Sequence, residues 1–351
     1  MTNPLTSDLD HILSHTYDLW EEVREKQIFI TGGTGFFGCW LLESFLWAND
    51  KLGLNSTIHV LTRNIKSFTN KAPHLASHPA IKLHCGDIQS FEFPNIKFSH
   101  IIHAATEVNV ISDSRTSVEA FNAITEGTKR VLDLAVQCKT SKFLLVSSGA
   151  VYGKQPSHLD YLCEDYEGAP DLMDWKSGYA QGKRVSEFLC NCYANKHTLE
   201  VKIARCFAFV GAYLSLESHL AIAGFIKSGL NGSDINIQGD GTTCRSYLYM
   251  ADLAIWLWTI LFKGENCYPY NVGSDKAITI AELANLVSRS FGNKQLVSIA
   301  KKHDPSQPIE RYVPSIQRAF NSLNLKPTIT LEDAIVRSIN WYSQARGVNH
   351  V

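Results

Sequence analysis

The sequence has no excess charge of either sign, because 33 lysines and arginines stand against 34 aspartates and glutamates. A protein that binds nucleic acid or an anionic membrane needs a basic surface, so we expect neither as a partner. Apolar runs stay well short of the roughly 18 residues that cross a bilayer. The first ten residues are partly acidic and lack the basic start and apolar stretch of a secretory signal. We therefore expect a cytoplasmic protein.

Cysteine patterns are also missing. The nine cysteines are scattered, with no C-x-x-C pair and no zinc-ligand spacing. An odd number without a disulfide framework is typical of reduced thiols, so we predict neither disulfides nor a bound metal. What remains is a chain of 351 residues, 45% of them hydrophobic, which is long enough to bury a core without such cross-links.

Short apolar strands alternate with helical segments from Gln27 to Phe207. This alternation predicts an α/β fold in which right-handed crossovers build a Rossmann-type doubly wound parallel sheet with helices on both faces. We expect strands at 27–31, 57–62, 81–85, 100–104, 142–148 and 200–207, and helices at 36–48, 117–138 and within 175–195.

The two ends of the chain have a different texture. Residues 8–25 place apolar side chains near helical spacing, which predicts an N-terminal helical extension, 1–26, outside the main fold. Residues 27–208 are then the nucleotide-binding domain. From 209 to 351, short strands and frequent glycine, asparagine, serine and proline predict a smaller substrate-binding lobe, with some chain crossing back to the sheet. The cleft between the two parts is the expected ligand site.

A glycine-rich turn lies between the first strand and the first helix of this sheet. The segment TGGTGFFG, residues 31–38, spaces its glycines as G-x-x-G-x-x-G. In a dinucleotide site, Gly32 permits the tight turn, Gly35 lets a pyrophosphate approach the backbone, and Gly38 lets helix and strand pack closely. The helix start at Phe36 and Phe37 then offers free N–H groups to the phosphates. A plain connecting loop is the alternative, and the strand–turn–helix context favours a nicotinamide dinucleotide.

The end of the second strand lacks the acidic residue that would hold the ribose diol of NAD. Arg63 stands there instead and can receive a 2′-phosphate, unless it is a solvated loop residue. We therefore predict that NADP(H) is preferred, with NAD(H) possible. Asp87 and Ile88 follow the third strand, where Asp87 is placed to contact the adenine or is an ordinary turn residue.

Tyr179 and Lys183 stand four residues apart and so share one helix face. The ammonium is expected to lower the pKa of the phenol and make it a general acid or base. Ser148 ends the fifth strand at the carboxyl edge of the sheet, where such folds bind ligands. Its hydroxyl can hold the oxygen that gains or loses the proton.

Taken together, these motifs resemble the extended short-chain dehydrogenases/reductases, the NAD(P)-dependent sugar-nucleotide epimerase/dehydratase/reductase family. The resemblance covers about Gln27 to Tyr342 and rests on TGGTGFFG at 31–38, GDI at 86–88, HAA at 103–105, SSGAVYG at 147–153, YAQGK at 179–183, GDGTTCRSYLYMADLA at 239–254 and YNVGS at 270–274. It implies a nucleoside-diphosphate sugar as substrate and a homodimer. It also implies cofactor contacts at Ala104 and Ala105, and substrate contacts at Ser148, Gly149, Arg245 and Arg311.

Departures from the family pattern narrow the expected reaction. Family dehydratases and decarboxylases place acidic residues where this chain has Gly149 and Ala150. Elimination of water then lacks an obvious acid, so a 4,6-dehydratase is disfavoured. Ala208 and Ile124 replace asparagines that many relatives carry, which weakens the transfer of substrate contacts from known members.

The resemblance and these departures predict an NADPH-dependent reduction of a nucleoside-diphosphate 4-keto-6-deoxyhexose at C4. A reductase of dTDP-4-keto-6-deoxyglucose is one example, serving deoxysugar synthesis for surface polysaccharides such as lipopolysaccharide. The alternative is a nucleotide-sugar 4-epimerase that holds NAD tightly. A non-enzymatic NADP(H)-binding regulator on the same fold is argued against by the intact set of Ser148, Tyr179 and Lys183.

Overall fold

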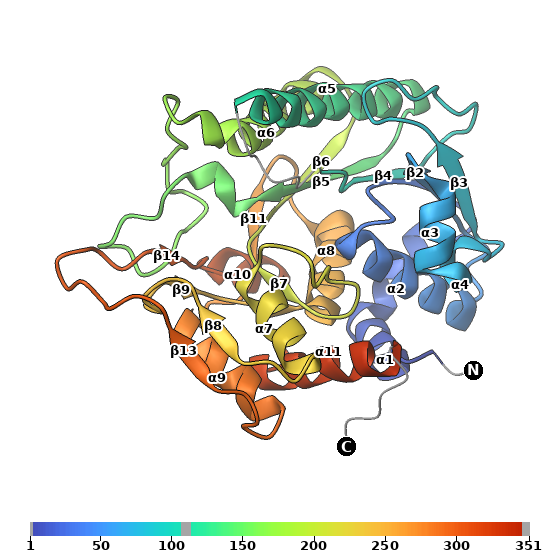
Figure 1. The fold of residues 1–351 in the computed structure, drawn as a ribbon. Coiled ribbons are helices and arrows are strands. Elements are labelled where there is room, and N and C mark those ends of the chain that lie inside the picture. Colours follow the sequence, from blue (N-terminus) through green and yellow to red (C-terminus); the bar gives the residue numbers. More distant parts are fainter. Residues whose placement is uncertain (1–2, 107–113, 346–351) are drawn as a thin grey trace.

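The computed structural model describes residues 3–106 and 114–345. A seven-stranded sheet forms its centre (Figure 1), in the order β3-β2-β1-β4-β5-β6-β11, and every neighbouring pair is parallel. This confirms the predicted Rossmann-type doubly wound sheet. The strands are β1 (Gln27–Thr31), β2 (Thr57–Thr62), β3 (Ile81–Cys85), β4 (His100–His103), β5 (Lys142–Ser148), β6 (Glu200–Cys206) and β11 (Pro269–Val272).

Helices cover both faces of this sheet (Figure 1). Successive residues of a strand point to opposite faces, so Phe29 packs in one core cluster while Ile28 and Ile30 pack in another. One face carries α5 (Ser114–Cys138) and α6 (Gly178–Lys196), and the other carries α2 (Phe36–Leu52) and α8 (Met250–Lys263). Two short helices, α3 (Ile65–Lys71) and α4 (Pro73–Ala76), connect β2 to β3.

The N-terminal segment does not lie outside the main fold as the sequence suggested. It forms α1 (Thr6–Thr16) and a 3-10 helix, η1 (Tyr17–Val23), and α1 packs against α2 and α8. Leu9, Ile12 and Trp20 are buried in the same core cluster as α8. The apolar residues of the segment therefore complete the core of the sheet domain, and the expectation is corrected.

Short elements build the C-terminal lobe, which lies below the carboxyl ends of the strands in Figure 1. β11 leaves this region to join the central sheet beside β6. The lobe's strands are β7 (Phe209–Val210), β8 (Ile235–Ile237), β9 (Cys244–Arg245), β10 (Leu248–Tyr249), β12 (Ile278–Thr279), β13 (Val297–Ile299) and β14 (Arg311–Tyr312). Its helices are α7 (Ala221–Leu230), α9 (Ile280–Ser290), α10 (Gln317–Leu323) and α11 (Leu331–Ala345).

Two 3-10 helices flank the segments that carry the predicted site, η2 (Gly149–Tyr152) after β5 and η3 (Trp175–Ser177) before α6. The helix expected within 175–195 is α6, which begins at Gly178, and the Asp174 side chain caps the preceding η3. Within the described ranges, no helix is long and apolar enough to span a membrane. The same residues contain no group of three or more His, Cys, Asp or Glu side chains suited to a metal ion.

Candidate active site

The glycine turn has the shape that a dinucleotide requires. Gly32 has a φ of +72°, and a Cβ there would lie 2.5 Å from the Ala104 carbonyl. A Cβ on Gly38 would lie 2.3 Å from the Gly32 oxygen, whereas one on Gly35 would meet only that oxygen, at 3.2 Å. Gly35 is the N-cap residue of α2, and it has no side chain that could occupy the N–H groups of the first turn. The N–H groups at Phe36 and Phe37 are therefore available to phosphate oxygens. These residues fit a dinucleotide.

A lysine side chain that the sequence analysis did not single out lies at this turn. Lys71 at the end of α3 donates a 2.9 Å hydrogen bond to the Thr34 carbonyl and lies 5.8 Å from the centre of the Tyr213 ring. Its place next to the turn comes from the folding of α3 back over the turn, which no local motif encodes.

The residues expected at the adenosine end lie at the carboxyl edge of the sheet. Arg63 directly follows β2 and is exposed. Asp87 accepts a 2.9 Å bond from the Gln89 backbone N–H, which is the ordinary turn role that the sequence left open. Ile88 packs against α5, since a Cβ on Gly127 would lie 2.8 Å from its side chain. The adenine contact of Asp87 and the cofactor contact of Ile88 stay predictions.

A chain of buried hydrogen bonds runs behind the turn. The Ala105 N–H donates to Thr31 Oγ1, which lies 2.7 Å from His103 Nδ1. His103 Nε2 is 3.1 Å from Thr128 Oγ1, and Thr128 is 2.8 Å from Ser186. Burial lowers the pKa of His103 to about 3, so its ring is neutral at physiological pH. This chain joins β1, β4, α5 and α6 and fixes the backbone at Ala104 and Ala105.

Ser148, Tyr179 and Lys183 come together as the sequence predicted. Ser148 is the last residue of β5, and hydrogen bonding between its hydroxyl and Tyr179 acts on the phenol. Lys183 Nζ donates to the Val146 carbonyl at 2.8 Å and lies 6.0 Å from the centre of the Tyr179 ring. Gly182 lets α6 approach α5, because a Cβ there would lie 3.2 Å from Ile124. The close packing of α6 on α5 thus determines how far Tyr179 lies from the end of β5.

The pKa of Tyr179 is shifted in the direction opposite to the expectation. Burial raises the pKa of Tyr179, while its hydrogen bond with Ser148 acts in the opposite direction. Burial lowers the pKa of Lys183 to about 8. The prediction that Lys183 lowers the Tyr179 pKa is therefore wrong for the protein groups alone, because desolvation of the phenol outweighs the favourable contacts.

Gly149 faces a residue that no motif singled out. A Cβ at position 149 would lie 2.6 Å from the Tyr312 hydroxyl oxygen and 2.7 Å from the Phe207 ring. The rings of Tyr312 and Phe207 lie 4.6 Å apart. Burial raises the pKa of Tyr312, and the neighbouring Ser148 hydroxyl acts in the opposite direction. Tyr312 is more than 130 positions away from Ser148 and Tyr179 in the sequence, so only the fold brings the three hydroxyls together.

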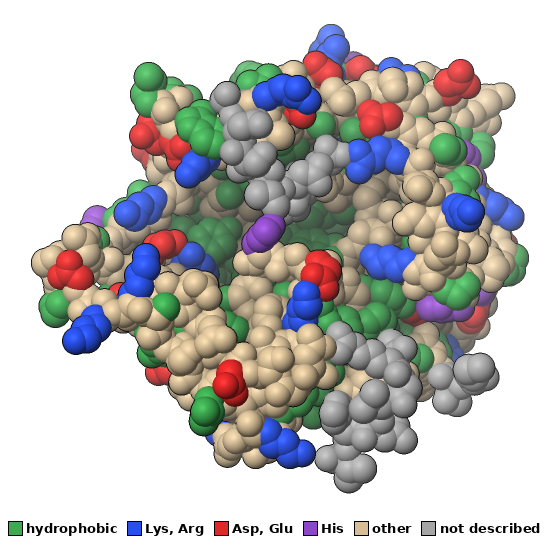
Figure 2. Space-filling model, viewed as in Figure 1, with side chains coloured by type: hydrophobic (Ala, Val, Ile, Leu, Met, Phe, Trp, Pro, Cys, Tyr) green, Lys and Arg blue, Asp and Glu red, His purple; other side chains and the backbone are tan. Residues whose placement is uncertain are grey.

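The two arginines predicted to bind diphosphate lie on adjacent strands of the C-terminal lobe, β9 and β14. Arg245 Nη2 donates to Glu310 Oε1 at 2.6 Å, and Arg311 Nη2 is 3.6 Å from Asp160 Oδ1. A diphosphate would have to exchange with these carboxylates. In Figure 2, hydrophobic side chains line a hollow between the sheet domain and this lobe, and lysine and arginine side chains lie near its margin.

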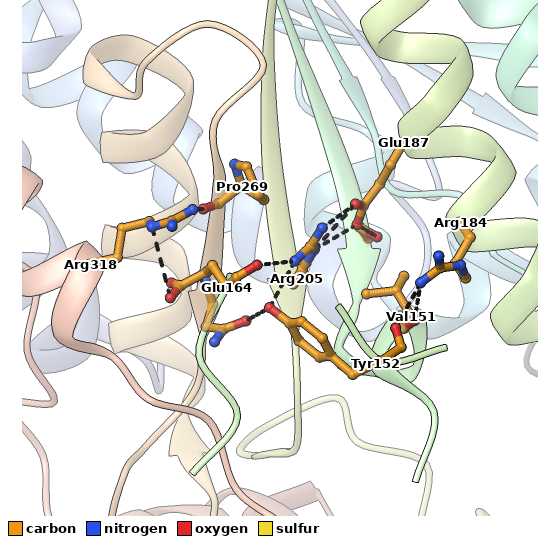
Figure 3. A network of polar contacts seen from close by, with 11 residues as sticks. Val151, Tyr152, Glu164, Arg184, Glu187, Arg205, Pro269 and Arg318 are labelled. Carbon is orange, nitrogen blue, oxygen red and sulfur yellow. Dashed lines mark hydrogen bonds and ion pairs between the residues drawn. The ribbon is translucent and has the colours of Figure 1, made fainter. Parts of the chain in front are cut away.

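A polar network connects α6 to the ends of β5 and β6 (Figure 3). Arg205 of β6 pairs with Glu187 of α6 at 2.7 Å and donates to the Tyr152 hydroxyl at 2.9 Å. Glu187 also accepts a 2.6 Å bond from Ser147, the neighbour of Ser148. The network therefore ties the Tyr179 helix to the Ser148 strand. The only sequence feature that could have indicated this structural role of Glu187 is its position four residues after Lys183, on the same face of the helix.

Comparisons with known proteins agree with the fold. The model of the NAD dependent epimerase/dehydratase family matches residues 28–273. UDP-glucuronic acid decarboxylase 1 of Danio rerio is 27% identical over 328 residues, which cover 92% of this chain and 74% of that protein. The UDP-glucose 4-epimerase of Thermotoga maritima superposes with a TM-score of 0.77 at 20% identity, covering 91% and 99% of the two chains. The UDP-glucuronic acid 4-epimerase of Bacillus cereus, solved with UDP-glucuronic acid and NAD, gives 0.76 at 20% identity and covers 91% and 99%.

Proposed function

The chain belongs to the NAD-dependent epimerase/dehydratase family, and we propose that it catalyses hydride transfer at C4 of a nucleoside-diphosphate sugar. One observation carries the proposal. Ser148, Tyr179 and Lys183 meet at the carboxyl edge of the sheet, in a Rossmann fold whose glycine turn fits a dinucleotide. This constellation suits oxidation of an alcohol or reduction of a ketone.

The protein groups have separate tasks in this reaction. Tyr179 takes the proton of the C4 hydroxyl when the alcohol is oxidised and returns it when the ketone is reduced. Ser148 holds the C4 oxygen, and Lys183, whose Nζ donates to the Val146 carbonyl, would bond the nicotinamide ribose. The glycine turn and the start of α2 would hold the pyrophosphate. The bound nicotinamide supplies the chemistry of accepting and returning the hydride at C4.

We propose 4-epimerisation as the net reaction. Removal and return of the hydride on opposite faces of C4 leaves the cofactor unchanged and needs no further acid. Gly149 has no side chain, and the nearest group is the neutral Tyr312 hydroxyl, so elimination or decarboxylation lacks a carboxyl group at this position. The resemblance to two solved UDP-sugar 4-epimerases is in line with this reaction.

Net reduction of a 4-keto sugar with NADPH is the second candidate. Two observations favour it. Arg63 stands where a carboxylate would select NAD, and the raised pKa of Tyr179 keeps the phenol protonated as an acid at neutral pH. NADP(H) is then the preferred cofactor, exchanging at each turnover.

The test uses the purified protein and unlabelled sugar nucleotides. Its bound nucleotide is extracted and identified, and the protein is incubated with UDP-glucose, UDP-N-acetylglucosamine, UDP-glucuronic acid and dTDP-glucose, with products read by proton NMR and mass. A 4-epimer formed without consumption of cofactor supports epimerisation. NADPH oxidation on dTDP-, CDP-, UDP- or GDP-4-keto-6-deoxyhexoses supports reduction. A product lighter by one water or one carbon dioxide would contradict both.

A further inference from the structure

Lys71 is the last residue of α3, and two groups hold its ammonium at the glycine turn. Nζ donates a 2.9 Å hydrogen bond to the Thr34 carbonyl and lies 5.8 Å from the centre of the Tyr213 ring. The Cys39 thiol, which belongs to α2, lies 3.8 Å from the same carbonyl oxygen. The ammonium therefore lies beside the start of α2, where free N–H groups are available to a phosphate.

The two structures that place Lys71 are themselves anchored. On one side, the Asn64 side chain caps α3, and Phe68 of that helix is buried. On the other side, the Tyr213 hydroxyl donates to the buried Glu43 carboxylate at 2.5 Å. Tyr213 has a φ of +69°, a conformation that residues other than glycine rarely adopt. The ammonium of Lys71 is thus positioned at the turn before any ligand arrives.

The charge of Lys71 has no acidic partner in the part of the chain that the structure describes. Glu43 accepts hydrogen bonds from Tyr213 and His74 instead. A cation beside a helix N-terminus is unfavourable, because that end of the helix carries partial positive charge. An ammonium has three N–H donors, the Thr34 carbonyl accepts one bond, and the Lys71 side chain is exposed. This combination favours an anion as a further ligand.

We propose that Lys71 binds a phosphate group of the nicotinamide dinucleotide, alongside the backbone N–H groups of the turn. The phosphate belongs either to the pyrophosphate or to the 2′-position of NADP(H), and both present the same anionic oxygens. Thr34 is two residues before Phe36, and neighbouring Cα atoms are about 3.8 Å apart, so the ammonium lies within reach of a nucleotide bound there. This inference rests on the proposed function, because it requires the turn to bind a dinucleotide.

The test compares charge with hydrogen bonding at position 71. NADH and NADPH are titrated by fluorescence into protein freed of bound nucleotide. Lys71→Gln keeps an N–H donor for Thr34 but removes the charge, and should raise the dissociation constant about tenfold. Lys71→Arg keeps the charge and should stay within about threefold of the wild type. Lys66→Gln, an exposed lysine on the same helix, is the matched control and should bind like the wild type.

The two cofactors identify which phosphate Lys71 contacts. Weaker binding of NADPH alone would assign Lys71 to the 2′-phosphate, and equal weakening of NADH and NADPH would assign it to the pyrophosphate; both results support the proposal. Unchanged binding of both cofactors in Lys71→Gln would overturn it. Equal weakening in Lys71→Gln and Lys71→Arg would also overturn it, because the loss would then come from a disturbed turn.

Ionic strength gives a second measurement that a purely structural role of Lys71 would not change. Salt screens an exposed contact between ammonium and phosphate, so the wild-type dissociation constant should rise more steeply than that of Lys71→Gln between about 0.05 and 0.5 M sodium chloride. Parallel salt dependences would overturn the proposal. Binding that depends on Lys71 in a protein inactive on every sugar nucleotide would support this inference and contradict the proposed function alone. If the wild type binds neither cofactor, both are wrong.

Discussion

Tyr179 carries the transferred proton in the proposed reaction, so its hydroxyl should matter for turnover and not for cofactor binding. We expect Tyr179→Phe to lower kcat by about 10²- to 10⁴-fold, the usual contribution of a positioned general acid or base. The dissociation constant of the nicotinamide cofactor, measured by fluorescence titration, should stay nearly unchanged. Retention of most of the turnover would remove Tyr179 from the mechanism.

Arg63 is expected to select the cofactor, because it follows β2 where a ribose-binding carboxylate is absent. A guanidinium bonds phosphate oxygens through paired donors. Arg63→Ala should therefore raise the dissociation constant for NADPH at least about tenfold while leaving that for NADH within about twofold. Fluorescence titration with both cofactors measures this. Equal changes for the two cofactors would show that Arg63 does not contact a 2′-phosphate.

The site residues that could be predicted from the sequence are those whose geometry is determined by one short segment of the chain. The glycine turn and the Tyr179–Lys183 spacing each occupy one short segment, and their geometry follows from a strand-to-helix turn or from one helix face. Tyr312 and Arg205 could not be found this way, since their partners lie on other elements. The direction of the Tyr179 pKa was also mispredicted, because desolvation depends on what the whole fold packs around the phenol.

Strands and long helices were predicted well because period and turn chemistry agree over many residues. β1, β2, β3 and β5 have the expected bounds. The N-terminal helix was expected to be continuous over 8–25, yet it changes to a 3-10 helix at Tyr17. Its packing against α8 is a long-range contact that periodicity does not encode.

The Glu187–Arg205 pair joins α6 to β6 beneath the site, and its loss should affect both stability and catalysis. Glu187→Ala leaves the largely buried guanidinium without its carboxylate, which should lower the free energy of unfolding by about 2 to 3 kcal/mol. It also removes the acceptor of Ser147, so kcat should fall as well. Urea unfolding and steady-state kinetics test this. Glu217→Ala, which breaks the exposed pair with Lys227, is the matched control and should cost far less.

His103 makes the hydrogen-bond chain between β1 and α5 sensitive to acid. Its pKa in the folded protein is lowered to about 3 by burial, from an ordinary 6.5, so below about pH 6.5 the unfolded chain binds a proton that the folded protein does not. Stability should therefore be lost as pH falls from about 6.5 toward 3, by at most about 1.4 kcal/mol per pH unit. His103→Gln should show a shallower slope than the wild type in urea unfolding at about pH 7, 6 and 5. Equal slopes would contradict the assignment.

The two ends of the described chain meet beside the sheet domain. α1 and α11 lie next to each other in Figure 1, and Arg337 of α11 pairs with Asp8 of α1. Asp8 also accepts a 2.6 Å bond from the Tyr249 hydroxyl, which directly precedes α8. The N-terminal segment thus links the C-terminal lobe to the helix that covers the sheet. The homodimer implied by the family resemblance stays a prediction.

This link should contribute to the stability of the whole molecule without taking part in the chemistry. Asp8 is 4% exposed, and Asp8→Asn keeps its shape while removing the charge that faces Arg337 and Tyr249. We expect the free energy of unfolding to fall by about 1 to 3 kcal/mol, with kcat per folded molecule unchanged, because the substituted group touches none of Ser148, Tyr179 and Tyr312. Asp18→Asn, an exposed carboxylate in the same segment, controls for the loss of charge and should leave stability unchanged. If Asp8→Asn instead lowers kcat in a fully folded protein, the N-terminal segment is coupled to the site and does more than complete the core.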